Sequence, residues 1–327
     1  MVRAPSRPAL PALLAVGVLA LSACGDGGTD TGGSASEGGS LTVVTATNVY
    51  GDIAASVGGD DVEVTSIVNG LSQDPHSYEA TVQDKLAVSE ADLVIENGGG
   101  YDPFLGRLVE ETGAEAVLNA VELSGLQPAA DDEEHADEDH PDDGDAHEGQ
   151  DHGAFNEHVW YSLPAMVVLA DAVAVELGSL DEANADAYRE RAEAFKAELQ
   201  PLQDRLATLS VESAGGTVAV TEPVPGYLLE AVGLEDVTPE GFSEAIEEET
   251  DVPIAVLEEM KFLVSEGDLA FLAYNEQTEG PQTEAVRDAA DSAGLPVVGF
   301  TETLPDGEDY VSWMTSNTAD IEAALRS

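Results

Sequence analysis

Histidine is scarce in this 327-residue sequence and is confined to one stretch of it. All six histidines lie between His76 and His158. His76 stands in residues 73–79 and His158 in residues 156–161, two segments whose composition is typical of ordered structure. Neutral imidazole is the commonest side-chain ligand of transition metals, and carboxylates are its usual company. The distribution predicts a metal-binding protein, although either histidine taken alone is more often a packed or capping residue.

The other four histidines lie in an acidic stretch, residues 128–153, which we expect to be disordered. Twelve acidic residues fall between Asp131 and Asp151, and this stretch has no large apolar side chain. Exposed imidazoles suit weak, rapid capture of zinc, so the stretch is interpreted as a loop that collects the metal. The alternative is an acidic insertion that is merely solvated. These four residues are His135, His140, His147 and His152.

The N-terminus predicts export. Basic residues precede an apolar run at 10–21, which is short for a membrane span. The run ends in Leu-Ser-Ala-Cys, which resembles a bacterial lipoprotein signal. We therefore expect a signal peptide at 1–23, a lipid on Cys24 and a flexible tether at 24–40. The alternative is an ordinary signal peptide followed by an incidental cysteine. Because Cys24 is the single cysteine of the sequence, an intramolecular disulfide is excluded.

The chain is strongly acidic, with a formal net charge of −55. This charge excludes nucleic acid as a partner and disfavours anionic lipid, which leaves the predicted acyl chain as the membrane contact. Acidity can attract cations or can reflect adaptation to high salt, and the composition leaves both explanations open.

Strand and helix patterns alternate along the chain, which predicts βαβ units and parallel sheets. We expect an α/β fold of two lobes, residues 41–180 and 213–327, joined by one long rigid helix at 181–212 with Asp181 as its N-cap. Ligands of such sheets lie beyond the carboxyl ends of the strands, where His76 falls. The expected strands are 41–47, 62–68, 92–96, 217–221, 269–274 and 296–300, and the expected shorter helices are 48–57, 81–89, 102–112, 227–232, 243–248, 254–266 and 283–293.

The second lobe contains no histidine, so any ligands it supplies must be carboxylates at strand ends. Glu222 directly follows one expected strand, and Glu302 follows another after a single threonine. In so acidic a chain such a glutamate is more often simply solvated. Asn275, Glu276 and Gln277 follow a third strand and could line the cleft in a supporting role.

Two segments carry a resemblance to a known family. Residues 72–81, Ser-Gln-Asp-Pro-His-Ser-Tyr-Glu-Ala-Thr, and residues 91–98, Ala-Asp-Leu-Val-Ile-Glu-Asn-Gly, resemble the zinc/manganese solute-binding proteins of bacterial ABC importers, the ZnuA/TroA-like family. The order of parts also agrees: a lipoprotein signal, an acidic histidine loop, a His-Val-Trp motif, a long helix and a second α/β lobe. The resemblance covers the chain from Leu41 onward.

The resemblance implies a set of ligands. His76 and His158 match the family's two first-lobe ligands. Glu222 occupies the place of the third ligand, where zinc members usually have His and manganese or iron members often have Glu. Glu302 occupies the place of the fourth, which is commonly Asp, and Glu157 also stands where Asp is usual. These departures leave the preferred metal open.

The implied donor set has a charge that suits a divalent ion. Two neutral imidazoles and two carboxylates balance its charge, and mixed nitrogen and oxygen donors suit Zn, Mn or Fe(II). The Irving–Williams order and the histidine-bearing loop favour Zn²⁺, with Mn²⁺ or Fe²⁺ as the alternative.

The resemblance also implies a function without catalysis. We expect a monomeric, extracytoplasmic receptor, lipid-anchored to the cell membrane, that captures a divalent ion between its lobes and delivers it to an ABC importer permease and its ATPase. A secreted metallohydrolase is the alternative, but the chain has no His-Glu-x-x-His motif, nucleophile elbow or phosphate loop. An adhesive role at the cell surface is compatible with the sequence.

Overall fold

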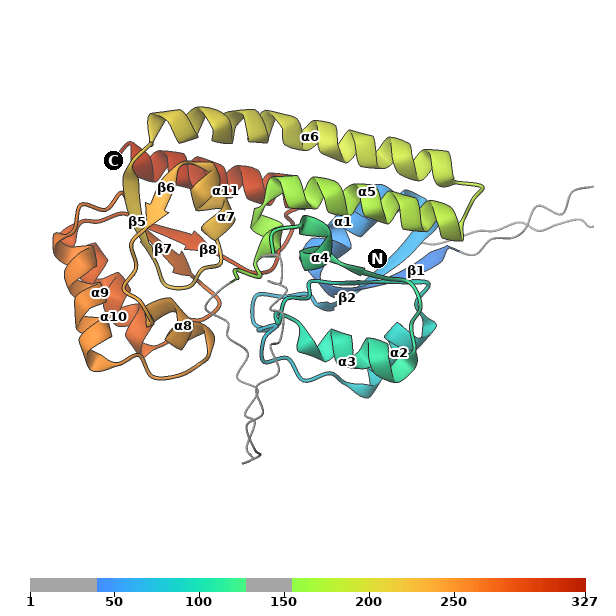
Figure 1. The fold of residues 1–327 in the computed structure, drawn as a ribbon, viewed down its shortest axis with the longest axis horizontal. Coiled ribbons are helices and arrows are strands. Elements are labelled where there is room, and N and C mark those ends of the chain that lie inside the picture. Colours follow the sequence, from blue (N-terminus) through green and yellow to red (C-terminus); the bar gives the residue numbers. More distant parts are fainter. Residues whose placement is uncertain (1–39, 128–154) are drawn as a thin grey trace, which may run out of the picture. The chain divides into compact units, whose positions relative to one another are not determined.

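The computed structural model describes residues 40–127 and 155–327, which form two α/β lobes (Figure 1). Each lobe has its own parallel sheet, as the alternating pattern predicts. Outside the described residues lie the predicted signal peptide, most of the tether, and these predicted site residues: Cys24, His135, His140, His147 and His152.

The first lobe is built on four parallel strands in the order β2-β1-β3-β4. Successive side chains of the central strand β1 point to opposite faces, so Val43 packs with α1 while Val44 packs with α2 and α3. Both valines are fully buried because helices cover both faces of the sheet. The elements of this lobe are β1 (Leu41–Thr47), α1 (Asn48–Gly58), η1 (Gly59–Asp61), β2 (Val62–Val68), α2 (Val82–Glu90), β3 (Leu93–Glu96), α3 (Pro103–Thr112), β4 (Val117–Asn119), α4 (Ala120–Ser124) and η3 (Val159–Tyr161).

The second lobe repeats the same strand order. Its parallel sheet runs β6-β5-β7-β8, so the first strand of each lobe again lies between the second and the third. The elements are β5 (Gly216–Val220), α7 (Gly226–Ala231), β6 (Leu234–Asp236), α8 (Phe242–Glu247), α9 (Ile254–Glu266), β7 (Leu272–Asn275), α10 (Pro281–Ala293) and β8 (Val297–Phe300).

Three long helices complete the fold: α5 (Leu163–Leu180), α6 (Ala185–Glu212) and α11 (Tyr310–Leu325). Figure 1 shows α6 running past both sheets, with α5 and α11 beside it. The apolar composition of α5 would also suit a membrane span, but it packs against α6, α4 and α1 as a core helix does. The buried side chains of α6 recur every three or four residues, as predicted: Tyr188, Ala192, Phe195, Leu199, Leu202, Leu206 and Leu209.

The two lobes share one apolar core and a set of polar contacts. A single cluster of buried side chains includes Val43 of the first sheet and Val220 of the second. Asn48 of α1 exchanges two hydrogen bonds with the backbone of Leu304, at 2.9 and 3.0 Å. The hydroxyl of Tyr310 donates to the carbonyl of Trp160 at 2.6 Å. Because these contacts are extensive and partly apolar, the lobes form a continuous scaffold around the residues between them.

The structure corrects the predicted start of the linking helix. Asp181 is the C-cap of α5 rather than the N-cap of α6. Its carboxylate accepts hydrogen bonds from Asn184 at 2.7 Å and from the Tyr188 hydroxyl at 3.1 Å, so it holds the turn between the two helices. Strands β4 and β6 and helices α4 and α11 have no counterpart in the prediction, and the two strands are only three residues long.

Candidate metal centre

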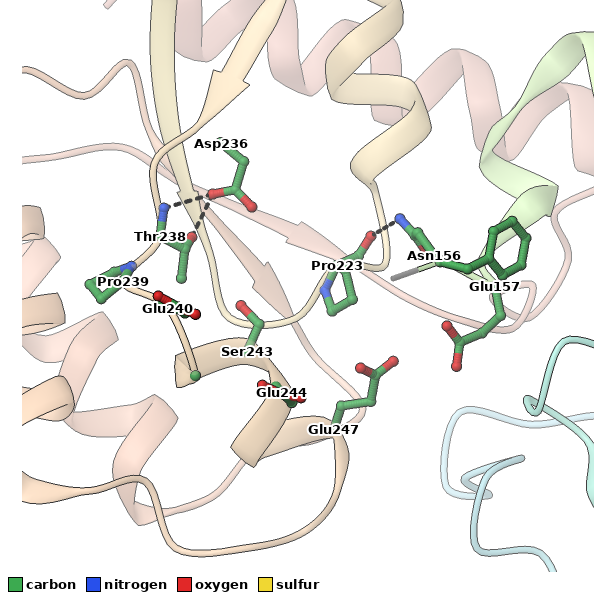
Figure 2. Close-up of a pocket in the computed structure, with 12 residues that line it drawn as sticks. Asn156, Glu157, Pro223, Asp236, Thr238, Pro239, Glu240, Ser243, Glu244 and Glu247 are labelled. Atoms are coloured by element: carbon green, nitrogen blue, oxygen red, sulfur yellow. Dashed lines mark hydrogen bonds between the residues drawn. The ribbon is translucent and has the colours of Figure 1, made fainter. Parts of the chain in front are cut away.

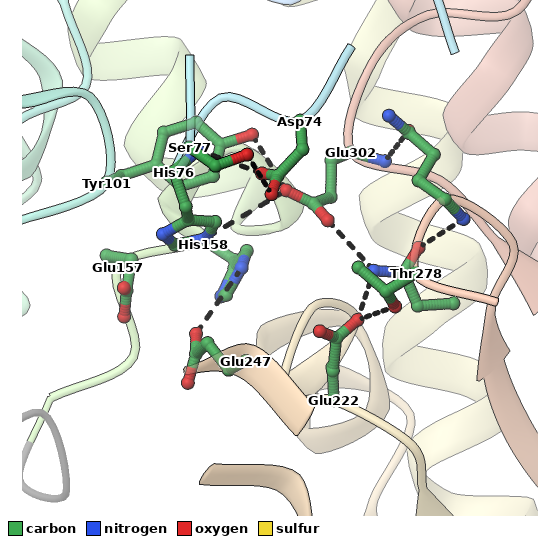
Figure 3. A network of polar contacts seen from close by, with 12 residues as sticks. Asp74, His76, Ser77, Tyr101, Glu157, His158, Glu222, Glu247, Thr278 and Glu302 are labelled. Carbon is green, nitrogen blue, oxygen red and sulfur yellow. Dashed lines mark hydrogen bonds and ion pairs between the residues drawn. The ribbon is translucent and has the colours of Figure 1, made fainter. Parts of the chain in front are cut away.

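The predicted ligands gather where strands of both sheets end. His76 lies in the loop after β2, Glu222 follows β5, and Glu302 follows β8, while His158 directly precedes η3. The carboxyl ends of parallel strands are the usual place for ligands in such folds. Figure 3 shows these side chains directed toward one another from the two lobes.

His158 is held rigidly among aromatic rings. Its Nδ1 lies 2.8 Å from Oδ1 of Asn156, so Nε2 is the nitrogen that faces the centre. The ring packs against Trp160 at 5.1 Å and against Tyr101 at 5.7 Å between centroids, and the residue is 1% exposed. Burial, followed by the nearby imidazole of His76, keeps the pKa of His158 well below its ordinary value. The ring is therefore neutral, which is the form that binds a metal.

His76 is the more exposed of the two imidazoles. Its backbone N–H donates to Oδ1 of Asp74 at 2.9 Å, and Ser77 donates to the other oxygen of that carboxylate at 2.9 Å, which fixes the tight loop. The ring packs edge-on against Tyr101, and its side chain is 23% exposed. Nε2 of His76 lies 4.0 Å from Oε2 of Glu302, so the first-lobe loop meets the second lobe here.

Glu302 is buried and well supplied with hydrogen-bond donors. Asn275 donates to Oε1 at 2.8 Å and the Tyr101 hydroxyl donates to Oε2 at 3.1 Å. The Glu302 backbone N–H donates to Oε1 of Gln277 at 2.6 Å, which fixes the strand end. Burial is the largest influence on the carboxyl and raises its pKa to about 7. The supporting roles predicted for Asn275 and Gln277 therefore have definite contacts, whereas Glu276 is exposed.

Glu222 lies beside Glu302 and shares its amide donor. Asn275 and Thr278 both donate to Oε2 of Glu222. Burial and then the neighbouring carboxyl of Glu302 raise the pKa of Glu222 to about 8. The amide of Asn275 thus links the two second-lobe carboxyls that the sequence singled out.

The structure brings some of the predicted ligands closer together than others. In the part of the chain that the structure describes, ligand atoms of His76, His158 and Glu302 all lie within 4.8 Å of one another. Glu222 is not a member of this group. A second group with the same spacing contains His76 with Glu157 and Glu247.

Glu247 is the residue that the sequence did not single out. It is the last residue of α8, and its Oε1 lies 3.9 Å from Nε2 of His158. Burial and then the charge of Glu157 raise the pKa of Glu247 to about 9. Glu247 stands in a run of acidic residues within a short helix, so its type and spacing carried no signal that separated it from its neighbours.

Known proteins match both the sequence and the fold. The family described as zinc-uptake complex component A periplasmic, ZnuA, matches residues 43–324. The manganese-binding lipoprotein MntA of Halalkalibacterium halodurans is 31% identical over 224 residues, which cover 67% of each chain. MntA of Bacillus subtilis is 30% identical over 200 residues, which cover 60% of this chain and 57% of that protein.

Solved structures support the fold at lower sequence identity. The periplasmic zinc-binding protein TroA from Treponema pallidum superposes with a TM-score of 0.70 at 21% identity, covering 88% of this chain and 99% of that one. FpvC from Pseudomonas aeruginosa, solved in complex with Mn²⁺, superposes with a TM-score of 0.67 at 21% identity, covering 88% and 98%. Because the family match spans nearly all of both lobes, the chain belongs to the ZnuA/TroA family of metal-binding solute-binding proteins of ABC importers.

Proposed function

We propose that this chain is a receptor that captures one divalent transition-metal ion between its lobes, at His76, His158 and Glu302, with Glu222 as the fourth ligand. The observation that carries the proposal is the convergence of two imidazoles from one lobe and a buried carboxyl from the other within 4.8 Å. Ligands of one ion lie roughly 3–4.4 Å apart when metal–ligand bonds are about 2.0–2.2 Å long, so small side-chain shifts would bring these atoms onto a single ion. Both imidazoles and both carboxyls come from segments fixed by hydrogen bonds, which suits selective binding rather than catalysis.

We propose manganese as the cargo. The second lobe offers only oxygen donors, and oxygen-rich sites accommodate the higher coordination numbers of Mn²⁺. Relatives at about 30% identity are named manganese-binding lipoproteins, which supports the same choice. Zinc, which the sequence favoured, binds most mixed nitrogen and oxygen sites more tightly than manganese does. It is therefore the competitor that any test must include.

The proposal extends to the membrane. We propose that residues 1–23 are removed, that Cys24 carries a lipid, and that the monomer presents its ion to an ABC permease with its ATPase. The MntA relatives are named lipoproteins, which supports an anchored, extracytoplasmic location. Labelling with a radioactive fatty acid should mark the native protein and should leave the Cys24→Ala variant unlabelled.

Calorimetry of the purified protein tests capture directly. One equivalent of Mn²⁺ should bind tightly, and His76→Ala and His158→Ala should each weaken this binding by roughly a hundredfold or more. His140→Ala, in the predicted loop, is the matched control and should retain it. Unchanged tight binding in His158→Ala would refute the proposed centre.

Growth of a deletion strain tests the cargo. If manganese is the cargo, added Mn²⁺ should rescue growth of the strain in metal-limited medium, and added Zn²⁺ should not. Rescue by Zn²⁺ alone would be consistent with the proposed receptor but would show that its cargo is zinc rather than manganese.

A further inference from the structure

An acidic pocket of about 380 Å³ lies beside the proposed centre. Its walls come from the segment that precedes η3 and from the region between β6 and the end of α8, as Figure 2 shows. Acidic pockets concentrate cations near their walls, because like charges with low-dielectric surroundings focus the electric field. The acidic residues of the lining are Glu157, Asp236, Glu240, Glu244 and Glu247.

Two acids of this pocket, Glu157 and Glu247, lie within 4.8 Å of a ligand atom of His76, and the carboxylate of Glu247 also approaches His158. Oε1 of Glu247 is 3.9 Å from Nε2 of His158, which is the ring nitrogen not engaged by Asn156. In Figure 3 the carboxylate of Glu247 points toward His158 from α8. An ion bound to Nε2 would lie in the plane of the ring, and Oε1 of Glu247 is near enough to this nitrogen for both atoms to reach the same ion after a small shift.

The burial of Glu247 indicates that its carboxylate needs a partner. The side chain is 14% exposed, and among the described residues its Oε1 is one of four buried side-chain atoms without a hydrogen bond. A buried carboxyl oxygen that no donor satisfies is unfavourable, and a bound cation would satisfy it. The ligand atoms of Glu247, Glu157 and His76 lie within 4.8 Å of one another, so the geometry also connects Glu247 to the second histidine.

We propose that Glu247 is a fifth ligand of the bound ion and that it determines specificity by raising the coordination number. This inference rests on the proposed function, because it adds an oxygen donor to the set formed by His76, His158, Glu302 and Glu222. Zinc is satisfied by four tetrahedral ligands, whereas manganese takes more oxygen donors. The extra negative charge is moderated by the hydrogen bonds that Asn275, Thr278 and Tyr101 donate to the other two carboxylates.

The test compares Mn²⁺ and Zn²⁺ affinities of the full-length protein, Glu247→Gln and Glu248→Gln by competition with a chelator. Glu248 is the matched control, since it is the next residue, is exposed, and undergoes the same change of side chain. We expect Glu247→Gln to weaken Mn²⁺ binding roughly 30- to 100-fold, which corresponds to about 2–3 kcal/mol, and Zn²⁺ binding less than about fivefold. Glu248→Gln should change neither affinity by more than about twofold.

Each other result overturns the inference. An equal loss for both metals in Glu247→Gln would mean that Glu247 acts only through charge or folding, and thermal unfolding of the apo protein would separate these two causes. No loss for either metal would remove Glu247 from the site. Failure of the unaltered protein to bind either ion would instead refute the proposed function, so the two failures are distinguishable.

Discussion

The two lobes hold their parts of the centre in different ways. In the first lobe the ring of His158 is fixed by packing against Trp160 and by one bond to Asn156. In the second lobe the carboxyls of Glu222 and Glu302 are fixed by amide and hydroxyl donors, chiefly from Asn275. Aromatic packing suits a neutral ring, whereas hydrogen-bond donors suit a group that must carry charge.

This difference has a consequence for protons. Burial lowers the pKa of His158, so this ligand is already deprotonated before an ion arrives. Burial raises the pKa of Glu302 to about 7 and that of Glu222 to about 8, so at pH values below these the carboxyls carry protons that an arriving ion must displace. The first lobe is therefore prepared for binding, and the second lobe makes binding depend on pH.

The largest expected loss of Mn²⁺ affinity comes from removing His158, the first-lobe ligand that is neutral before an ion binds. His158→Ala should weaken Mn²⁺ binding by roughly a hundredfold to a thousandfold, because apparent energies of about 10–16 kcal/mol for four-ligand zinc sites give about 2.5–4 kcal/mol for each ligand. Chelator competition measures the loss. A His158→Ala protein that loses less affinity than Glu302→Gln would reverse the ranking of the two lobes.

Removal of the shared donor in the second lobe should have the next largest effect. Asn275→Ala deprives both Glu222 and Glu302 of a hydrogen bond and should weaken Mn²⁺ binding about 10- to 100-fold, the usual cost of losing a residue that orients metal ligands. Thr278→Val removes a donor to Glu222 alone and should cost less. Equal losses in the two variants would show that Glu302 gains nothing from Asn275.

The pH dependence should be smaller and should come from the second lobe. Carboxyls with pKa values of about 7 and about 8 are largely protonated at pH 6 and must lose those protons when an ion binds. Mn²⁺ affinity should therefore rise as pH increases from about 6 to 8.5. His158 adds nothing to this slope, because its lowered pKa leaves it neutral throughout the range. Calorimetry in buffers of different ionisation enthalpy measures the protons released, and a pH-independent affinity would contradict the contrast between lobes.

The long, strongly patterned elements of the fold could be predicted from the sequence. The buried strand β1 and the amphipathic stripe of α6 have clear periods, and both are confirmed. Edge strand β6 has only Leu234 buried among its three residues, so no period could identify it. The start of helix α11 could have been predicted, because Asp309 is a favourable N-cap residue and forms a capping box with Ser312.

The site could be predicted where residue type is rare and not where it is common. The chain has only six histidines, and their distribution drew attention to His76 and His158, whose ligand atoms the structure brings within 4.8 Å of each other. Glu222 and Glu302 needed the resemblance, because a glutamate is unremarkable among 66 acidic residues. Glu247 becomes visible only through its tertiary contact with His158. The assignment of all these ligands stays a prediction that metal binding must test.

The smallest expected effect tests whether a first-lobe residue acts on a second-lobe ligand. Tyr101 is fully buried, packs against His76 and Trp160, and donates its hydroxyl to Glu302 at 3.1 Å. Tyr101→Phe keeps the ring and removes only that bond. One such bond is worth about 0.5–1.5 kcal/mol, so Mn²⁺ affinity at pH 7 should fall roughly twofold to tenfold.

The pH dependence of this loss shows whether the Tyr101 hydroxyl changes the pKa of Glu302 or only its position. The Tyr101 hydroxyl lowers the pKa of Glu302, so its removal raises that pKa and leaves the carboxyl more protonated near neutrality. The affinity lost by Tyr101→Phe should therefore shrink as pH rises from 7 to about 8.5, where Glu302 ionises in both proteins. A loss of the same size at both pH values would mean that the hydroxyl positions the carboxylate rather than setting its charge. In that case Tyr101 would have no part in the contrast between His158, which is neutral before an ion binds, and the second-lobe carboxyls, which lose protons when it binds.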